Sequence, residues 1–195
     1  MRKNNWAEKK RDGFSLVELM VIIAVIAILG ATAVPSVINW LPDYRLKTAA
    51  DNLVSRLQQA KIQAARLNAE CVIFFDNAAN SYHLVSGGND GIFNGPPVPS
   101  GDDELLHTGL LEAYGNGVRF GPGNATTHVT GGAWAAGADP WDYALGDYIL
   151  FDPKGILFET GYVYLRNDDG ACIAVGTPTL AGAIVQTKWR NGAWD

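Results

Sequence analysis

The sequence predicts an α+β fold, in which a long N-terminal helix packs on a C-terminal head of antiparallel β-sheet. Residues 14–34 form an apolar run long enough for a transmembrane helix, and residues 35–69 continue with apolar side chains at helical spacing. From residue 70 onward, short segments rich in Val, Ile, Phe and Tyr alternate with turns rich in Gly, Asp and Asn. A chain of 195 residues can fill one core and one extended element, but hardly two full domains.

The charge of the chain is divided unevenly. Residues 1–13 contain five basic and two acidic side chains, so their removal changes the net charge from −5 to −8. Positive charge before an apolar run holds that end of the chain in the cytoplasm. The acidic remainder repels the phosphate backbone, which argues against general nucleic-acid binding.

The apolar run from Phe14 to Val34 carries a single charge, Glu18. As a helix it would rise about 32 Å, which matches the hydrocarbon thickness of a bilayer. A secretory signal would have a shorter apolar core with a small-residue cleavage site after it, and neither is evident here. A plain single-pass anchor explains the length of the run, but it leaves the carboxylate unexplained. A charge at the centre of a membrane helix costs about 2.5–3.5 kcal/mol, and an intramembrane charge indicates function by default.

The segment Gly13-Phe14-Ser15-Leu16-Val17-Glu18, with the apolar run and Pro35 after it, resembles the prepilin signature of type IV pilins and type II secretion pseudopilins. The resemblance implies that residues 1–13 are a leader, which a prepilin peptidase removes by cutting between Gly13 and Phe14. It also implies N-methylation of Phe14, and pairing of Glu18 with the Phe14 amine of a neighbouring subunit during assembly. In lipid, an ammonium and a carboxylate cost less together than apart. An uncleaved generic anchor is the alternative.

Residues 35–69 predict an amphipathic helix beyond the membrane. Pro35 and Pro42 each remove a backbone donor, and we expect a helix kink at Pro35. The apolar side chains then follow one stripe at spacings of four and three: Leu46, Ala50, Leu53, Leu57, Ala60, Ala64 and Leu67. The stripe fits a helix packed on a sheet or a coiled-coil seam, and the β-rich segment after it favours the sheet. Asn68 is the expected helix end.

Residues 70–195 are expected to form the β-rich head. The predicted strands are Cys71–Phe75 and Ser81–Val85 as a hairpin, Gly117–Phe120, Tyr148–Phe151, Gly155–Phe158, Tyr162–Leu165, Cys172–Val175 and Ala183–Trp189. Residues 87–146 are predicted to be a mostly irregular surface insertion, a kind of segment that often carries partner contacts.

The layout of the head resembles the GspH/FimT branch of the pseudopilins and minor pilins. Three features carry this resemblance: the hairpin directly after the helix, the turn at residues 151–155, and a last strand led by Gly182. The resemblance implies a structural, non-enzymatic subunit of a type II secretion pseudopilus or a type IV pilus. It also implies a single-pass protein of the bacterial inner membrane with its head in the periplasm. The implied partners are other pilins or pseudopilins, the prepilin peptidase and membrane lipid.

Two cysteines, Cys71 and Cys172, fall in the head. Because a periplasmic domain is in an oxidising compartment, we expect a disulfide between them. It would close a loop of about a hundred residues and contribute roughly 2–4 kcal/mol. Two buried free thiols are the alternative.

The sequence shows no metal or catalytic constellation. Asn89-Asp90-Gly91 and Asp102-Asp103-Glu104 are acidic loop residues of a type that can bind calcium, but they lack EF-hand spacing, so solvated loop charge is favoured. The histidines, His83, His107 and His128, lie on different segments without a Cys or His at ligand spacing. We expect no cofactor and no enzymatic activity, because no nucleophile has an evident base.

DNA binding in natural transformation is the alternative function, because some FimT-like minor pilins bind DNA through a terminal G-R-x-R motif. The matching stretch here is Gly182-Ala183-Ile184-Val185, which has no arginine. Lys188 and Arg190, with Trp189 and Trp194, form a small basic–aromatic tail that could contact a strand of DNA. An ordinary last strand is favoured, because the chain after residue 13 is acidic.

Overall fold

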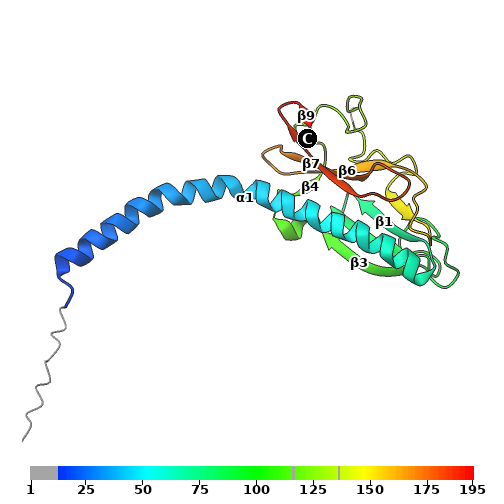
Figure 1. Cartoon of the computed structure of the whole chain (residues 1–195), viewed down its shortest axis with the longest axis horizontal. Coiled ribbons are helices and arrows are strands. Elements are labelled where there is room, and N and C mark those ends of the chain that lie inside the picture. Colours follow the sequence, from blue (N-terminus) through cyan, green and yellow to red (C-terminus); the bar gives the residue numbers. More distant parts are fainter. Residues whose placement is uncertain (1–12, 116, 136) are drawn as a thin grey trace, which may run out of the picture. The chain divides into compact units, whose positions relative to one another are not determined.

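The computed structural model describes residues 13–115, 117–135 and 137–195 (Figure 1). The chain divides into two compact units, residues 1–40 and residues 41–195. Most of the predicted leader lies outside the described residues, and only Gly13 falls within them.

One helix, α1 (Leu16–Leu67), makes up most of the described part of the first unit and continues into the second. Ser15 begins it as an N-cap: its hydroxyl accepts a hydrogen bond from the backbone N–H of Glu18 at 3.1 Å. This bond satisfies one of the donors that the first turn of a helix leaves without an internal partner. The residues that follow are mostly Leu, Ile, Val and Ala, and helical structure continues past Pro35 and Pro42.

The predicted apolar stripe lies on the buried face of α1 in the second unit. Its first six members are fully buried: Leu46, Ala50, Leu53, Leu57, Ala60 and Ala64. The last predicted member, Leu67, is 42% exposed, so the prediction is wrong at that position. Leu67 is the last residue of the helix, and Asn68 after it has a left-handed backbone with φ 51°, as a helix end requires. The packing of the stripe confirms a helix on a sheet.

The first sheet has four antiparallel strands in the order β3-β2-β1-β5. The strands are β1 (Cys71–Asp76), β2 (Ser81–Ser86), β3 (Glu104–Leu110) and β5 (Tyr148–Phe151). The β1–β2 hairpin confirms the predicted one, with Phe75 opposite Tyr82. Its turn is closed by the Asp76 carboxylate, which accepts the backbone N–H of Ala79 at 2.8 Å.

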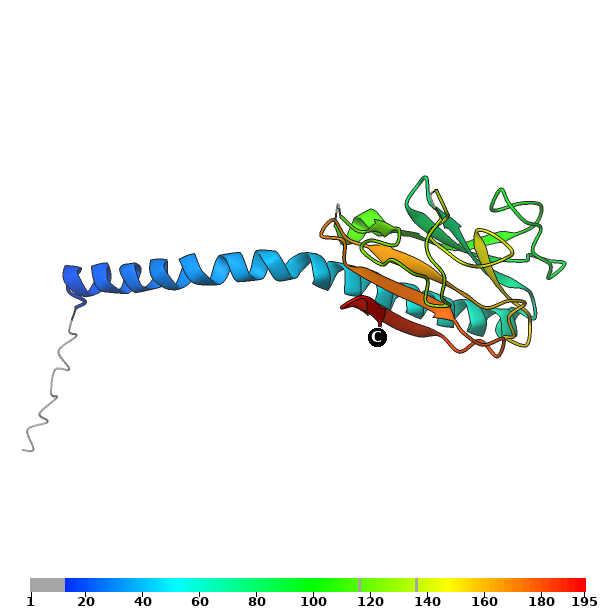
Figure 2. The same ribbon diagram turned by 90° about the horizontal axis from the view of Figure 1, so that it is seen from above.

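The second sheet has five strands in the order β4-β6-β7-β8-β9. They are β4 (Arg119–Phe120), β6 (Gly161–Arg166), β7 (Cys172–Thr177), β8 (Val185–Arg190) and β9 (Ala193–Trp194). The last strands run beside residues 41–67 of α1 (Figure 2). There the Lys188 ammonium on β8 donates to the Asp43 carboxylate of α1 at 2.8 Å.

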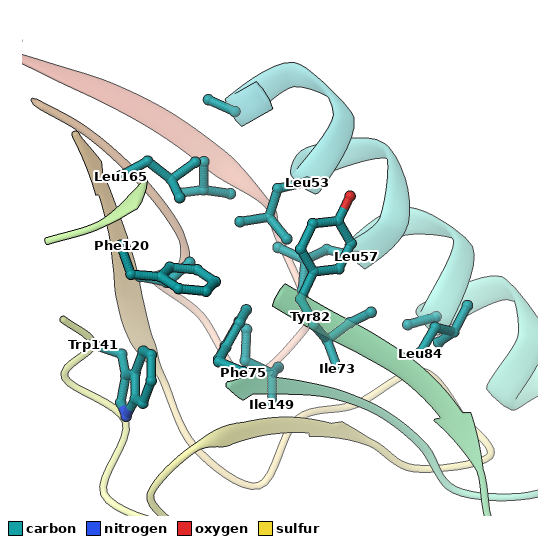
Figure 3. Close-up of a cluster of buried hydrophobic side chains, with 14 of the residues drawn as sticks. Leu53, Leu57, Ile73, Phe75, Tyr82, Leu84, Phe120, Trp141, Ile149 and Leu165 are labelled. Atoms are coloured by element: carbon teal, nitrogen blue, oxygen red, sulfur yellow. The ribbon is translucent and has the colours of Figure 1, made fainter. Parts of the chain in front are cut away.

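The main core lies where α1 meets the inner faces of both sheets (Figure 3). Leu53 and Leu57 of α1 belong to the same cluster as Phe75 of β1 and Phe120 of β4. Aromatic rings fill its centre, with the Phe75 centroid 5.8 Å from that of Phe120 and 5.5 Å from that of Trp141. Each fully buried side chain of this size stabilises the fold by about 1.5–3 kcal/mol.

Asn80, in the turn between β1 and β2, ties the two sheets together. Its side-chain amide donates to the Val118 carbonyl at 3.0 Å and accepts the Phe120 N–H at 3.2 Å. Asn80 therefore supplies hydrogen-bond partners for two backbone groups on the side of β4 that faces away from β6. Its left-handed backbone, with φ 50°, is tolerated better by asparagine than by most residues.

The head departs from the predictions in two segments. Residues 87–146 are less irregular than expected, because they contain β3 and a 3-10 turn, Leu111–Tyr114, besides the predicted strand around β4. The predicted strand Gly155–Phe158 is wrong, since this segment makes one isolated bridge, between Phe151 and Leu157. The Asp152 carboxylate accepts hydrogen bonds from the backbone N–H groups of Lys154 and Ile156 at 2.8 and 2.7 Å. These two donors therefore stabilise the turn and do not bond to a neighbouring strand.

Candidate functional site

Between Leu16 and Leu29, the helix of the first unit presents apolar side chains on all sides. Phe14 and Leu16 are each 74% exposed. The other large apolar residues up to position 29 are also exposed: Val17, Leu19, Met20, Val21, Ile22, Ile23, Val25, Ile26, Ile28 and Leu29. A helix that is apolar on all sides is stable when lipid or other apolar helices cover it.

Glu18 is the one charged residue of this apolar segment, and it lies in the first turn of α1. Its side chain is exposed, and its backbone N–H is held by the Ser15 hydroxyl. A negative charge in the first turn interacts favourably with the positive end of the helix dipole. The capped turn thus holds a carboxylate at the start of the apolar surface, where an external cation can reach it.

Gly13 and Phe14 precede the helix in non-helical, exposed chain. A Cβ added at Gly13 would meet no atom within 4 Å. The predicted cut between these residues therefore falls on a peptide bond that no other described part of the chain covers. Cleavage, and N-methylation of Phe14, remain predictions.

Two further predictions for this helix remain without confirmation. Within the described residues, no helix is both long enough and apolar enough to cross a membrane. The kink at Pro35 also stays a prediction, because α1 runs through this position as one helix.

The predicted disulfide is wrong, because Cys71 and Cys172 are both free and fully buried. Cys71 lies on β1 in the main core, whereas Cys172 lies on β7 in a second apolar cluster on the other face of the second sheet. The Cys172 thiol instead makes a weak hydrogen bond to the Gly121 carbonyl, with a sulfur–oxygen distance of 3.8 Å. The sheets thus separate two residues that the sequence alone allows to meet.

The basic–aromatic tail is largely engaged within the head. Lys188 pairs with Asp43 of α1, and Arg190 lies 3.8 Å from a carboxylate oxygen of Asp195. The indole rings of Trp189 and Trp194 pack edge to face with centroids 5.2 Å apart. The Trp194 ring also lies 5.4 Å from that of Tyr164, so the tail covers the second apolar cluster. The arrangement is that of an ordinary last hairpin.

The two acidic loop segments come together in the structure, although they are distant in sequence. The Asp102 carboxylate accepts the backbone N–H groups of Asn89 and Asp90 at 2.8 and 3.2 Å, and these bonds hold the pKa of Asp102 below its ordinary value. Asp103 accepts the backbone N–H of Asn94 at 3.2 Å. In the described ranges, no three His, Cys, Asp or Glu side chains are grouped to hold a metal ion. These carboxylates therefore organise the loop, and calcium binding stays without support.

Sequence reasoning missed Asp142, which links Thr130 to Tyr162 and Tyr164 of β6. Its carboxylate accepts the Thr130 and Tyr164 hydroxyls, each at 3.1 Å, and the backbone N–H of Tyr162. Burial, first of all, raises the pKa of Tyr164, so this hydroxyl remains a donor at neutral pH. The imidazole of His128 lies 3.7 Å from the same carboxylate. No motif joins these residues, and only the fold brings them together.

Comparisons with known proteins place these features in context. The sequence matches the family model of the prokaryotic N-terminal methylation motif over residues 9–34. It matches the family model of the type II transport protein GspH over residues 49–179. No protein with a curated description matches the sequence.

Two solved structures are similar to this chain at low sequence identity. One is the type IV minor pilin FimU of Pseudomonas aeruginosa, with 13% identity and a TM-score of 0.46, covering 77% of this chain and 97% of FimU. The other is the minor pseudopilin EpsH of the type 2 secretion system of Vibrio cholerae, with 9% identity and a TM-score of 0.44, covering 73% of this chain and 95% of EpsH.

Proposed function

We propose a function from one premise: the chain belongs to the GspH family of type II transport proteins. It is a structural subunit, a minor pilin or pseudopilin that adds to a filament of similar subunits. The match to a type II transport model favours the pseudopilus of a secretion system over a pilus. The role is mechanical, and no catalytic step is assigned to the chain.

One observation carries this proposal: an exposed apolar helix that begins with a capped turn and a single carboxylate, Glu18. The segment coincides with the matched N-terminal methylation motif, residues 9–34. Packing among the apolar helices of other subunits would remove this surface from water. The head would then face outward and contact its neighbours in the filament.

The precursor is proposed to be held in the inner membrane by residues 14–34, with its head in the periplasm. Prepilin peptidase would cut after Gly13 and methylate Phe14. The basic leader before an apolar run supports this orientation. Cleavage creates the Phe14 amine, and pairing with Glu18 of another subunit would neutralise both charges in an apolar surrounding.

The test is Glu18→Ala in a host strain that lacks its own copy of the gene. We expect cleavage and methylation to continue, which the mass of the N-terminal peptide reports. Incorporation into sheared filaments should fall at least tenfold, because the Phe14 amine loses its counter-ion. Glu104→Ala removes an exposed carboxylate from the head and serves as the matched control.

Two outcomes separate the parts of the proposal. Normal incorporation of Glu18→Ala would contradict the role of the ion pair. Absence of the unaltered chain from every filament fraction would contradict the structural function itself. DNA binding is not proposed as a second function, because Lys188 already pairs with Asp43.

A further inference from the structure

We propose that a groove around Arg166, at the seam between the two sheets, binds a carboxylate on an acidic segment of another protein. The site lies in the head, away from Glu18 and the apolar helix. It does not depend on the filament role proposed above.

The argument begins with two arginines that face each other across strands. Arg119 on β4 lies directly opposite Arg166 on β6. Residues opposite each other in an antiparallel pair place their side chains on the same face, and like charges in such positions are destabilising. The fold thus maintains two arginine side chains on one face at the edge of its second sheet.

The two arginines differ in their partners. Arg119 pairs with Asp168, in the turn that joins β6 to β7. The Arg166 guanidinium makes no ion pair or hydrogen bond with the described residues, although its side chain is only partly exposed. Asp168 therefore pairs with Arg119, and Arg166 is left without a counter-ion among the described residues.

The backbone beside Arg166 leaves room for its side chain. A Cβ built on Gly121 would lie 2.8 Å from both the Cδ and the Nε atoms of Arg166. The absence of a side chain at Gly121 therefore allows the Arg166 side chain to lie close along the β4 end of the sheet. This packing restricts the guanidinium, which lowers the entropy that binding would otherwise cost.

Arg166 lines two adjoining hollows of about 410 and 290 Å³. Both are also lined by Asn77, an exposed residue of the β1–β2 turn, and by the buried residue Phe120. Glu112 lines the larger hollow but forms no ion pair with either arginine. The groove therefore offers a cation and a side-chain amide on adjoining parts of its lining.

This combination suits a carboxylate carried on a chain. A guanidinium binds a carboxylate with two parallel hydrogen bonds, and the backbone of a peptide beside it can also bond to the Asn77 amide. A free anion would use the cation alone. The chain after residue 13 has a net charge of −8, so it repels anions in general. Binding of an acidic peptide would therefore report a specific local site.

The test uses the full chain in non-ionic detergent and a fluorescent hexapeptide of alternating glutamate and glycine. We expect this probe to bind at least tenfold more tightly than the same peptide with glutamine. Arg166→Gln should weaken binding at least tenfold. The matched control Arg190→Gln alters another exposed arginine outside the groove and should leave the affinity unchanged.

Thermal unfolding separates binding from a structural role. Arg166→Gln should keep or raise the unfolding temperature, because it removes a cation opposite Arg119. A fall of several degrees would show that Arg166 supports the fold instead. The proposal is also overturned if the unaltered chain does not bind the probe, or if Arg166→Gln binds it normally. Competition by inorganic phosphate as effective as that by the unlabelled peptide would show a site for small anions, and would likewise overturn it.

Discussion

At the scale of single residues, the two cysteines show how surroundings control reactivity. Burial raises the pKa of the Cys71 thiol to about 11 and that of Cys172 to about 12. Oxidation and alkylation proceed through the thiolate, which is scarce at neutral pH when the pKa is so high. Each thiol is also enclosed by a different apolar cluster. Both residues therefore behave as small apolar side chains and not as reactive thiols.

We expect Cys71 and Cys172 to resist alkylation in the folded chain. Iodoacetamide at pH 7.5 should modify less than about a tenth of either thiol in native buffer within minutes. In guanidinium chloride without reductant, both should react fully, and intact mass spectrometry counts the added groups. A denatured sample that gains the groups only after reduction would show that the two residues are bonded.

At the scale of elements, the helix was the part most fully predicted from the sequence. Its stripe requires only local spacing, and six of the seven predicted positions are buried. The exception, Leu67, lies in the last turn, where burial depends on how closely the following hairpin approaches. Spacing along a helix cannot supply that information.

Leu53 and Leu67 allow the stability contribution of a buried stripe residue to be compared with that of the exposed residue at the end of the helix. Leu53→Ala should lower the free energy of unfolding by about 2–5 kcal/mol, because it leaves a cavity in the main core. Leu67→Ala should cost less than about 1 kcal/mol, because the side chain is already 42% exposed. Urea unfolding followed by tryptophan fluorescence measures both. Equal losses for the two variants would contradict the packing described here.

The strands were less predictable, because a strand forms by pairing with residues that are distant in the sequence. The sequence of β3, Glu104–Leu110, mixes exposed and partly buried side chains without alternation, and it becomes a strand by pairing with β2. Conversely, the sequence of Gly155–Phe158 is typical of a strand, but it forms none. The Asp152 carboxylate accepts hydrogen bonds from the backbone N–H groups of Lys154 and Ile156. The motif around Glu18 needed only neighbouring residues, whereas the Arg166 groove joins residues from both sheets.

At the scale of the whole molecule, charge is divided unevenly between the N-terminal residues and the rest of the chain. Residues 1–13 hold five of the 15 basic residues, and the chain after residue 13 has a net charge of −8. Phosphate binding requires local clusters of lysine and arginine that exceed the surrounding acidic field. The cations of the last strand do not form such a cluster, because Lys188 pairs with Asp43 and Arg190 lies near Asp195.

We therefore expect the chain without residues 1–13 to bind duplex or single-stranded DNA weakly and without a specific site. An electrophoretic mobility shift at about 50 mM salt should show no complex at micromolar protein, the range of non-specific binders. The double variant Lys188→Gln/Arg190→Gln should behave in the same way, because Lys188 already pairs with Asp43 and Arg190 alone forms no basic cluster. Asp43→Asn is the informative control, since it releases Lys188 without adding a basic residue, and it should still form no complex. A shifted band that salt abolishes and the double variant loses would instead favour a DNA-binding minor pilin, because the tail would then override the acidic field of the head.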